Sequence, residues 1–134
     1  MATSSVRAPI TIRLPFTPAS VSVARQQLKN WMSENGGTGE AVEDARVVVS
    51  ELVANSIRHA SPLSDGQIHV SWVLDHQGIE LSVTDGGSTT RPRKVNAPSS
   101  ALAGRGMAIV ETLAQEWWSE RTGSRTTVYA LLYI

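Results

Sequence analysis

The sequence predicts a single α+β domain, a two-layer sandwich in which a mixed, mostly antiparallel sheet has helices on one face. Two pairs of alternating apolar and polar runs, at residues 67–85 and 116–133, have the pattern of hairpins. Three segments with apolar residues at helical spacing separate these pairs from each other and from a short first strand. Strands joined by hairpins lack the strand–helix alternation of a doubly wound parallel sheet.

The chain begins with a segment that is expected to be flexible, at residues 1–9, followed by one domain at residues 10–134. A length of 134 residues with 41% hydrophobic content allows one buried core and is too short for two. Residues 10–16 alternate as Ile-Thr-Ile-Arg-Leu-Pro-Phe, which predicts a strand. Pro15 has no N–H to donate, so this strand is expected at an edge of the sheet.

Two helices are predicted next. Thr17 followed by Pro18 has the pattern of an N-cap and a first helical turn, and apolar residues recur at helical spacing until Gly36. Thr38 has the side chain of an N-cap for the second helix. The apolar stripe of that helix continues until Ser61, which precedes a proline.

The second half of the chain contains the two hairpins and a third helix. Strands are predicted at residues 67–75 and 79–85, and again at residues 116–121 and 125–133. Between the hairpins, a helix is predicted from Met107 to about Gln115, with Gly-Arg-Gly immediately before it. The predicted order is β-α-α-β-β-α-β-β.

Composition excludes several classes of function. Twelve basic and twelve acidic residues give no net charge, which argues against nucleic acid and anionic membranes as partners. The chain has no cysteine, so disulfides and thiolate metal sites are excluded, and a cytoplasmic location is expected. No segment has the roughly 18 consecutive apolar residues of a membrane-spanning helix, and no secretory signal is evident.

The second predicted helix carries the most informative pair of residues, Glu51 and Asn55. Positions four apart lie on the same side of a helix, so a carboxylate and a carboxamide point together into one space. Unpaired polar groups at a partly buried position cost on the order of 1–3 kcal/mol each. The pair therefore indicates a ligand.

Two glycine-rich segments are ambiguous by themselves. Asp85-Gly86-Gly87 can be a simple turn, or a carboxylate that accepts a hydrogen bond from a purine amine beside a backbone that a ring can approach. Gly104-Arg105-Gly106 can turn the chain or present N–H groups to phosphate. Walker A and dinucleotide-binding loops are absent, as is a convincing zinc site.

Taken together, these segments resemble the GHKL (Bergerat-fold) ATPase and kinase superfamily. That superfamily has four sequence motifs, called the N, G1, G2 and G3 boxes. Four segments of this chain occur in the same order: the helix with Glu51 and Asn55, the Asp-Gly-Gly run, the Gly-Arg-Gly-Met run and a final Gly-to-Tyr segment. Two segments are similar to the motifs of stand-alone anti-sigma factor serine/threonine kinases: Val-Val-Ser-Glu-Leu-Val-Ala-Asn-Ser-Ile-Arg-His-Ala and Gly-Arg-Gly-Met-Ala-Ile-Val-Glu. The resemblance extends from about Ile10 to Tyr133.

The resemblance implies a role for each polar residue of the second helix. It assigns Asn55 to the Mg²⁺ ion that bridges the phosphates of ATP, which suits a carboxamide oxygen. It assigns Glu51 as the general base that positions or deprotonates the attacking serine hydroxyl of a protein substrate. Arg58 matches a basic position that meets phosphate, although a solvated surface explains it about as well. His59 matches a position that lies against the nucleotide.

The resemblance also implies the contacts to the base and the phosphates. Asp85 would accept a hydrogen bond from the adenine amino group, with Gly87 beside it and Thr127 supporting the contact. Residues 86–103 would form a lid over the nucleotide. The Gly-Arg-Gly-Met run supplies the remaining nucleotide-binding positions: Gly104, Arg105, Gly106 and Met107.

The implied function is an ATP- and Mg²⁺-dependent protein serine/threonine kinase that acts as an anti-sigma factor. It would phosphorylate a STAS-domain anti-anti-sigma protein, bind a sigma factor and form a homodimer. The alternative is a catalytically weak nucleotide-binding module that switches partners without phosphoryl transfer. The presence of Glu51 favours the kinase, because an inert nucleotide binder has no need of a base.

Overall fold

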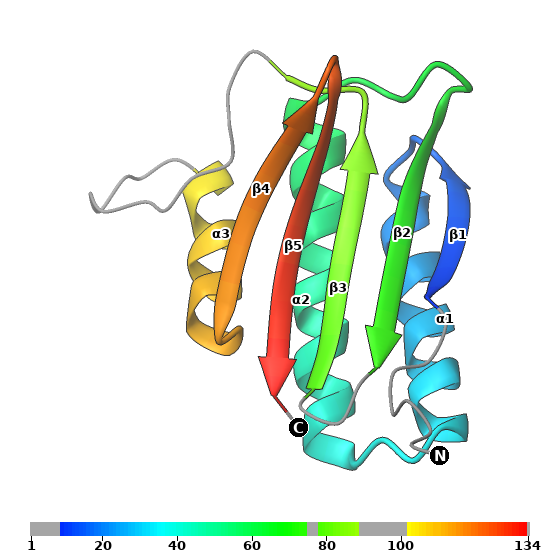
Figure 1. Ribbon diagram of the computed structural model, residues 1–134, viewed down its shortest axis with the longest axis vertical. Helices are drawn as coiled ribbons and strands as arrows, with labels where there is room; N and C mark the ends of the chain where they lie inside the picture. Colours follow the sequence, from blue (N-terminus) through cyan, green and yellow to red (C-terminus); the bar gives the residue numbers. More distant parts are fainter. Residues whose placement is uncertain (1–8, 75–77, 89–101, 134) are drawn as a thin grey trace, which may run out of the picture.

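The computed structural model describes residues 9–74, 78–88 and 102–133, and it shows one five-stranded sheet with three helices against it (Figure 1). The elements in chain order are β1 (Ile10–Pro15), α1 (Ala19–Glu34), α2 (Gly39–His59), β2 (Gln67–Leu74), β3 (Gly78–Asp85), α3 (Leu102–Leu113), β4 (Glu116–Thr122) and β5 (Arg125–Tyr133). This order and the α+β class confirm the prediction. The expected flexible segment, apart from Pro9, and residues 89–101 of the expected lid lie outside the described residues.

The sheet has the strand order β1-β2-β3-β5-β4, and all four pairings are antiparallel. β1 pairs only with β2, so Pro15 lies at the edge, as its missing N–H predicts. β3 lies at the centre of the sheet. Gly78 begins β3 where a Cβ would collide with the carbonyl oxygen of Leu132, so this close approach of two strands requires glycine.

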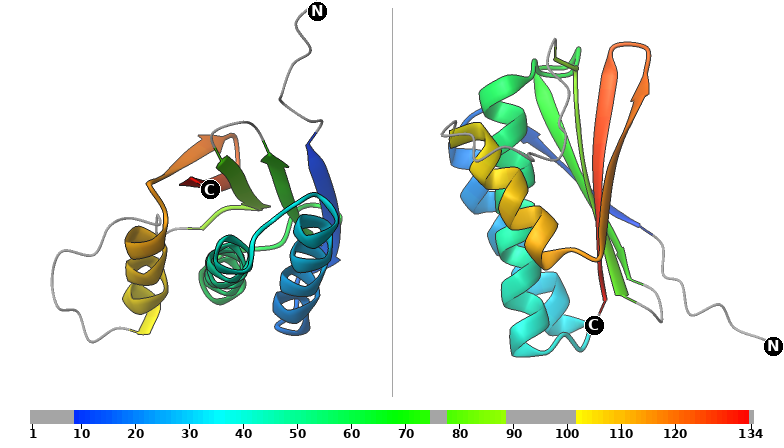
Figure 2. Two further views of the ribbon diagram at one scale, coloured as in Figure 1. Left: turned by 90° about the horizontal axis from the view of Figure 1, so that it is seen from below. Right: turned by 90° about the vertical axis from the view of Figure 1, so that its left-hand side faces the viewer.

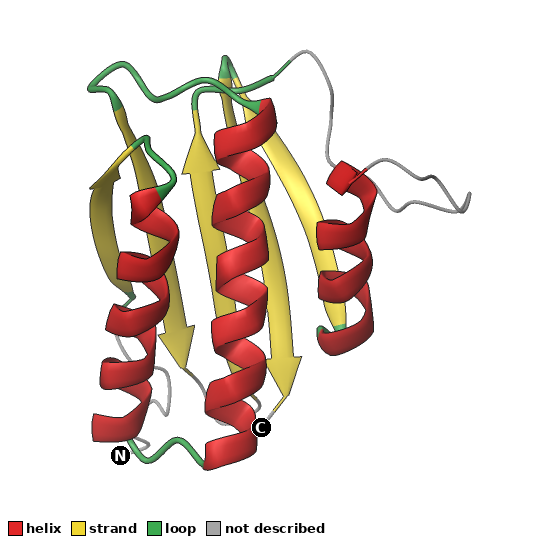
Figure 3. Ribbon diagram, turned by 180° about the vertical axis from the view of Figure 1, so that it is seen from behind, coloured by secondary structure: helices red, strands yellow, loops and turns green. Residues whose placement is uncertain are grey.

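All three helices lie side by side on one face of the sheet, with α2 between α1 and α3 (Figures 2 and 3). The core lies between the two layers because the alternating apolar residues of the strands meet the apolar stripes of the helices. Its largest fully buried side chains are Leu28, Met32, Leu52, Ile68, Ile79, Leu81, Val48, Val49, Val53, Val70, Val83 and Val110. None of the helices in the described part of the chain is long and apolar enough to cross a membrane.

The structure corrects the start of the first helix. Pro18 occupies the N-cap position of α1, so Thr17 lies one residue too early to cap it. The carbonyl oxygen of Thr17 instead accepts a hydrogen bond from the N–H of Ser20 at 3.0 Å. Thr38 is the N-cap of α2, as predicted, but its side chain makes no capping hydrogen bond.

The third helix begins earlier than predicted. α3 starts at Leu102, so Gly104, Arg105 and Gly106 form part of the helix rather than the turn before it. Each glycine costs roughly 1 kcal/mol relative to alanine in a helix, and burial of apolar side chains further along offsets that cost. Met107 and Val110, at 3% and 0% exposed, supply this packing against the core.

Candidate nucleotide-binding site

The C-terminal half of α2 presents Glu51 and Asn55 together. Both side chains are half-buried, and neither has a hydrogen-bond partner among the described residues. Their neighbours on the core side of the helix, Leu52, Val53 and Ser56, are buried and fix the rotation of α2 against the sheet. Glu51 and Asn55 are therefore available to a ligand, and their role in binding one stays a prediction.

Asp85 lies at the end of β3, next to this half of α2. It is only 4% exposed, and each of its carboxylate oxygens accepts one hydrogen bond. The hydroxyl of Ser56 donates to Oδ2 at 2.6 Å, and the N–H of Gly87 donates to Oδ1 at 2.8 Å. Each oxygen keeps a second lone pair, so the carboxylate can still accept from a ligand amine.

Burial raises the pKa of Asp85 above its usual 3.8, while the hydrogen bonds from Ser56 and Gly87 oppose the rise. A buried carboxylate with a raised pKa beside the polar side chains of α2 is a candidate functional position. Ser56 was not among the residues predicted for the site. Its place one residue after Asn55, on the core side of the helix, is a signal that could have identified it.

Two backbone hydrogen bonds fasten the end of α2 to the end of β3. The N–H of Gly86 donates to the carbonyl oxygen of Ser61 at 2.8 Å, and the N–H of Ser61 donates to that of Gly87 at 2.9 Å. A Cβ at Gly86 would collide with the carbonyl oxygen of Pro62. At Gly87, φ is +96°, and a Cβ would collide with the carbonyl oxygen of Ser124. Glycine is required at both positions because the backbones of Pro62 and Ser124 come close, whereas the sequence analysis had considered a simple turn or the approach of a ligand ring.

The structure contradicts the expected partnership of Thr127 with Asp85. Thr127 pairs with Thr84, and their hydroxyl oxygens lie 2.8 Å apart on the sheet face that points away from the helices. Asp85 pairs with Thr126, which alternation places on the helix side of β5. The Oγ1 atom of Thr126 lies 3.7 Å from the position of a Cβ on Gly87. Thr126, and not Thr127, therefore lies on the same side of the sheet as Asp85.

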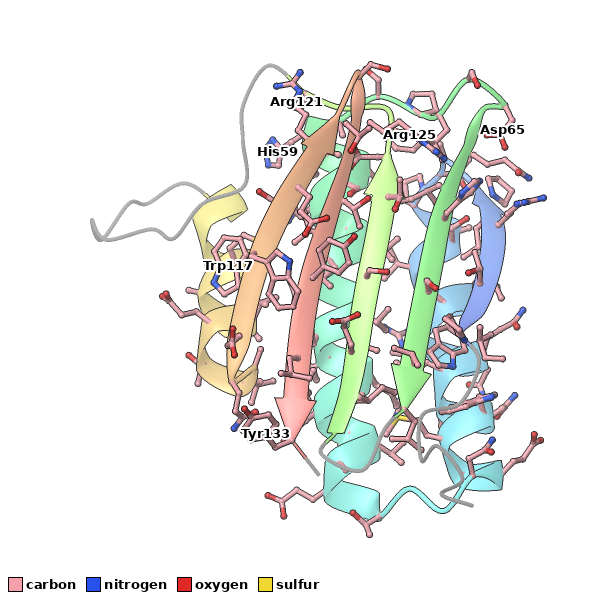
Figure 4. The ribbon with its side chains drawn as sticks, in the orientation of Figure 1. His59, Asp65, Trp117, Arg121, Arg125 and Tyr133 are labelled. Atoms are coloured by element: carbon pink, nitrogen blue, oxygen red, sulfur yellow. The ribbon has the colours of Figure 1, made fainter. Side chains whose placement is uncertain are left out.

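The end of α2 carries two exposed side chains, Arg58 and His59, in its last turn. The positive charge of Arg58 interacts favourably with the helix dipole there. Figure 4 shows His59 and Arg121 at the end of the molecule that carries the β4–β5 hairpin. Arg121 pairs with Thr126, which puts it on the helix side of β4 in the row that contains Asp85. Sequence analysis did not include Arg121.

Among the described residues, the side chains could supply one ligand to a Mg²⁺ ion but not a complete set of ligands. No group of three or more His, Asp or Glu side chains that could hold a metal ion occurs in the described ranges. Mg²⁺ in nucleotide sites commonly takes most of its ligands from phosphate oxygens and water, with one or two from the protein. The unpartnered carboxamide of Asn55 fits that role.

Comparisons with known proteins show which family the sequence matches. Residues 14–131 match the family described as "Histidine kinase-like ATPase domain". Serine-protein kinase RsbW of Listeria monocytogenes is 32% identical over 119 residues, which cover 80% of this chain and 76% of that protein. RsbW of Staphylococcus aureus is 28% identical over 120 residues, which cover 80% and 76%.

Two solved structures share the fold. The RsbU and RsbW domains of Rv1364c from Mycobacterium tuberculosis give a TM-score of 0.72 at 24% identity, covering 95% of this chain and 32% of that chain. The SiaB–SiaC complex from Pseudomonas aeruginosa gives a TM-score of 0.72 at 11% identity, covering 96% and 90%. The fold and the superfamily that the sequence predicted are therefore confirmed. From the match over residues 14–131 and the identity to RsbW, the chain belongs to the histidine kinase-like ATPase domain family and groups there with the RsbW serine-protein kinases.

Proposed function

We propose that the chain is an ATP- and Mg²⁺-dependent protein serine kinase that regulates transcription in the cytoplasm as an anti-sigma factor. Its phosphoryl acceptor would be a STAS-domain anti-anti-sigma protein, and its regulatory target a sigma factor. One observation carries the proposal: Glu51 and Asn55 share a helix face beside the buried carboxylate of Asp85. The names of the RsbW relatives support kinase activity. The family resemblance further supports a homodimer.

The adenine and the Mg²⁺ ion would bind at neighbouring positions, at the end of β3 and on α2. The remaining lone pairs of Asp85 would accept the adenine amino group, with Thr126, rather than Thr127, at its side. Asn55 would hold Mg²⁺, which neutralises phosphate charge when it is bound. Arg58 and His59 would lie near the outer part of the nucleotide. The run from Gly104 to Met107 would approach the phosphates through its backbone.

Glu51 would act on the protein substrate. Its carboxylate would accept the proton of a substrate serine hydroxyl as the serine oxygen forms a bond to the γ-phosphorus of ATP. The bond between that phosphorus and the bridging oxygen breaks at the same time, and ADP leaves with the electron pair. The absence of a hydrogen-bond partner for Glu51 among the described residues leaves its oxygens available for this contact.

Two variants separate binding from transfer. Asn55→Ala is expected to abolish detectable Mg²⁺-ATP binding by calorimetry, because it removes the metal ligand. Glu51→Gln is expected to bind Mg²⁺-ATP normally and to lose about 100- to 10,000-fold in transfer of labelled phosphate to a STAS protein from the same genome. Glu40→Gln is the matched control, since Glu40 lies in the first turn of the same helix.

The outcomes distinguish the two candidate functions. Equal ATP affinity in the wild type and Asn55→Ala would contradict the metal assignment. ATP binding without any labelled protein would replace the kinase with the catalytically weak switching module. Full transfer by Glu51→Gln would remove Glu51 as the base while leaving the nucleotide site intact.

A further inference from the structure

The outer face of the sheet, which we define as the side of β1–β5 away from the helices, has no covering layer in the described part of the chain (Figure 2). This face nevertheless carries apolar groups. Trp118 and Tyr129 stack with their ring centroids 5.0 Å apart and their planes 9° apart, and Val73 and Leu131 share the face. These side chains are half-buried. A large apolar and aromatic area on an open sheet face is typical of an interaction surface.

The strand pairings place outer-face residues in rows across the sheet. The upper row is Arg13, His69, Thr84, Thr127 and Glu120. The middle row is Thr11, Ser71, Ser82, Tyr129 and Trp118. The lower row is Val73, Glu80, Leu131 and Glu116. Opposite charges therefore occupy the two ends of the upper row, Arg13 on one edge strand and Glu120 on the other.

The two edges of the outer face differ in charge: the β1 edge carries Arg13, and the β4 edge carries acidic side chains. Arg13 is exposed and makes no ion pair with any residue that the structure describes. On the opposite edge, acidic side chains surround Tyr129. Desolvation raises the pKa of the Tyr129 hydroxyl, and Glu120 and then Glu80 raise it further. That edge is thus an electronegative surface over a stacked aromatic pair, which is the environment that attracts a guanidinium group.

We propose that the outer face is the interface of the homodimer, with the twofold axis parallel to the strands along β3. This inference rests on the homodimer proposed above. A twofold axis in this direction places β1 of each protomer over β4 of the other, so Arg13 faces the partner's Glu120 twice by symmetry. Val73 likewise faces the partner's Leu131. An in-plane axis perpendicular to the strands would place each strand over its own copy and the upper row over the lower row, so Glu120 would face the partner's Glu116 and like charges disfavour it.

The size of the face suits a stable dimer. Five strands about 4.8 Å apart, with six to nine residues each, give a plane of roughly 20 by 25 Å. The side chains that project from it supply an accessible area approaching the roughly 800 Å² per partner of a standard interface. Packed sheets cross at about 30°, and the long side chains of Arg13 and Glu120 can span the resulting offset.

The same axis predicts that one substitution within the interface strengthens dimerisation instead of weakening it. Glu80 lies on the central strand, so the twofold axis brings it near its own copy. Two carboxylates at that separation repel each other, and the repulsion weakens association. Neutralising Glu80 is therefore expected to tighten the dimer, whereas most changes within an interface loosen it.

The test is the concentration dependence of the mass in sedimentation equilibrium. Arg13→Glu and Glu120→Arg are each expected to raise the dimer Kd by about 10-fold or more, and the double charge exchange to restore it largely. Glu80→Gln is expected to lower the Kd. Lys29→Glu, which makes the same charge change on α1, is the control and is expected to leave the Kd unchanged. ATP affinity, measured on the same samples, is expected to be unchanged in all of these variants.

Each result bears on one part of the proposal. A wild-type dimer whose Kd responds to neither Arg13→Glu nor Glu120→Arg would show that the dimer uses another surface. A weaker dimer in Glu80→Gln would overturn the position of the axis. A wild-type chain that stays monomeric at all concentrations would overturn both the dimer and the interface, while its ATP binding and phosphotransfer would still decide the kinase function independently.

Discussion

Asp85→Asn is expected to weaken nucleotide binding while leaving the fold intact. The asparagine has the same shape, its Oδ1 can accept from the N–H of Gly87, and its amide can donate to the hydroxyl oxygen of Ser56. The adenine amino group would then meet an amide donor in place of a carboxylate acceptor. A hydrogen bond to a charged group contributes about 1.5–3 kcal/mol, so the Kd for ATP is expected to rise by about 10- to 150-fold.

The same substitution has a pH signature. Because burial raises the pKa of Asp85, the folded state binds its proton more tightly than the unfolded state does. The contribution of Asp85 to stability is then greatest below its usual pKa of 3.8 and is lost as the pH rises through the folded-state value. The free energy of unfolding of Asp85→Asn minus that of the wild type should therefore increase from pH 4 to pH 7.

Urea unfolding at several pH values and calorimetry with ATP measure the two effects. A stability difference that falls with rising pH would refute the account of Asp85 as a carboxylate that burial destabilises. An unchanged ATP affinity would show that Asp85 does not contact the base.

Three further predictions follow from local geometry. Thr126→Val is expected to weaken ATP binding by about 2- to 10-fold in calorimetry, and Thr127→Val, one residue away on the outer face, to leave it unchanged; equal effects would contradict the assignment of Thr126. Gly87→Ala is expected to destabilise the fold by more than about 2 kcal/mol in urea, because φ is +96° and the new Cβ meets the carbonyl oxygen of Ser124. Leu28→Ala should cost about 2–5 kcal/mol by the same measurement, since Leu28 is fully buried.

The order of elements could be predicted from the sequence because each strand and helix has a clear period. The start of α3 could not, because glycines at 104 and 106 are strong turn signals locally. In the structure both glycines lie inside α3, and Met107 and Val110 further along the helix are packed into the core.

On β5, the sequence predicted Thr127 where the strand pairing places Thr126 beside Asp85. The sequence after Arg125 carries apolar residues on both faces, with Val128 and Ala130 on one and Tyr129 and Leu131 on the other. The family resemblance assigned Thr127, and hydrophobic alternation could not correct this assignment because it does not show which face of β5 is buried. The register with Asp85 decides it. The ambiguity has a physical origin, because the outer face of β5 also carries large apolar side chains.

The backbone hydrogen bonds of Ser61 with Gly86 and Gly87 have a consequence for the proposed nucleotide site. Because these bonds join α2 to β3, Asn55 and Asp85 belong to one rigid body before any ligand arrives. A ligand that spans the two residues need not order this side of the site, which would otherwise cost about 1–2 kcal/mol per residue in conformational entropy. In the proposed site, the fixed separation of Asp85 and Asn55 would favour a ligand whose base and phosphates have the matching spacing.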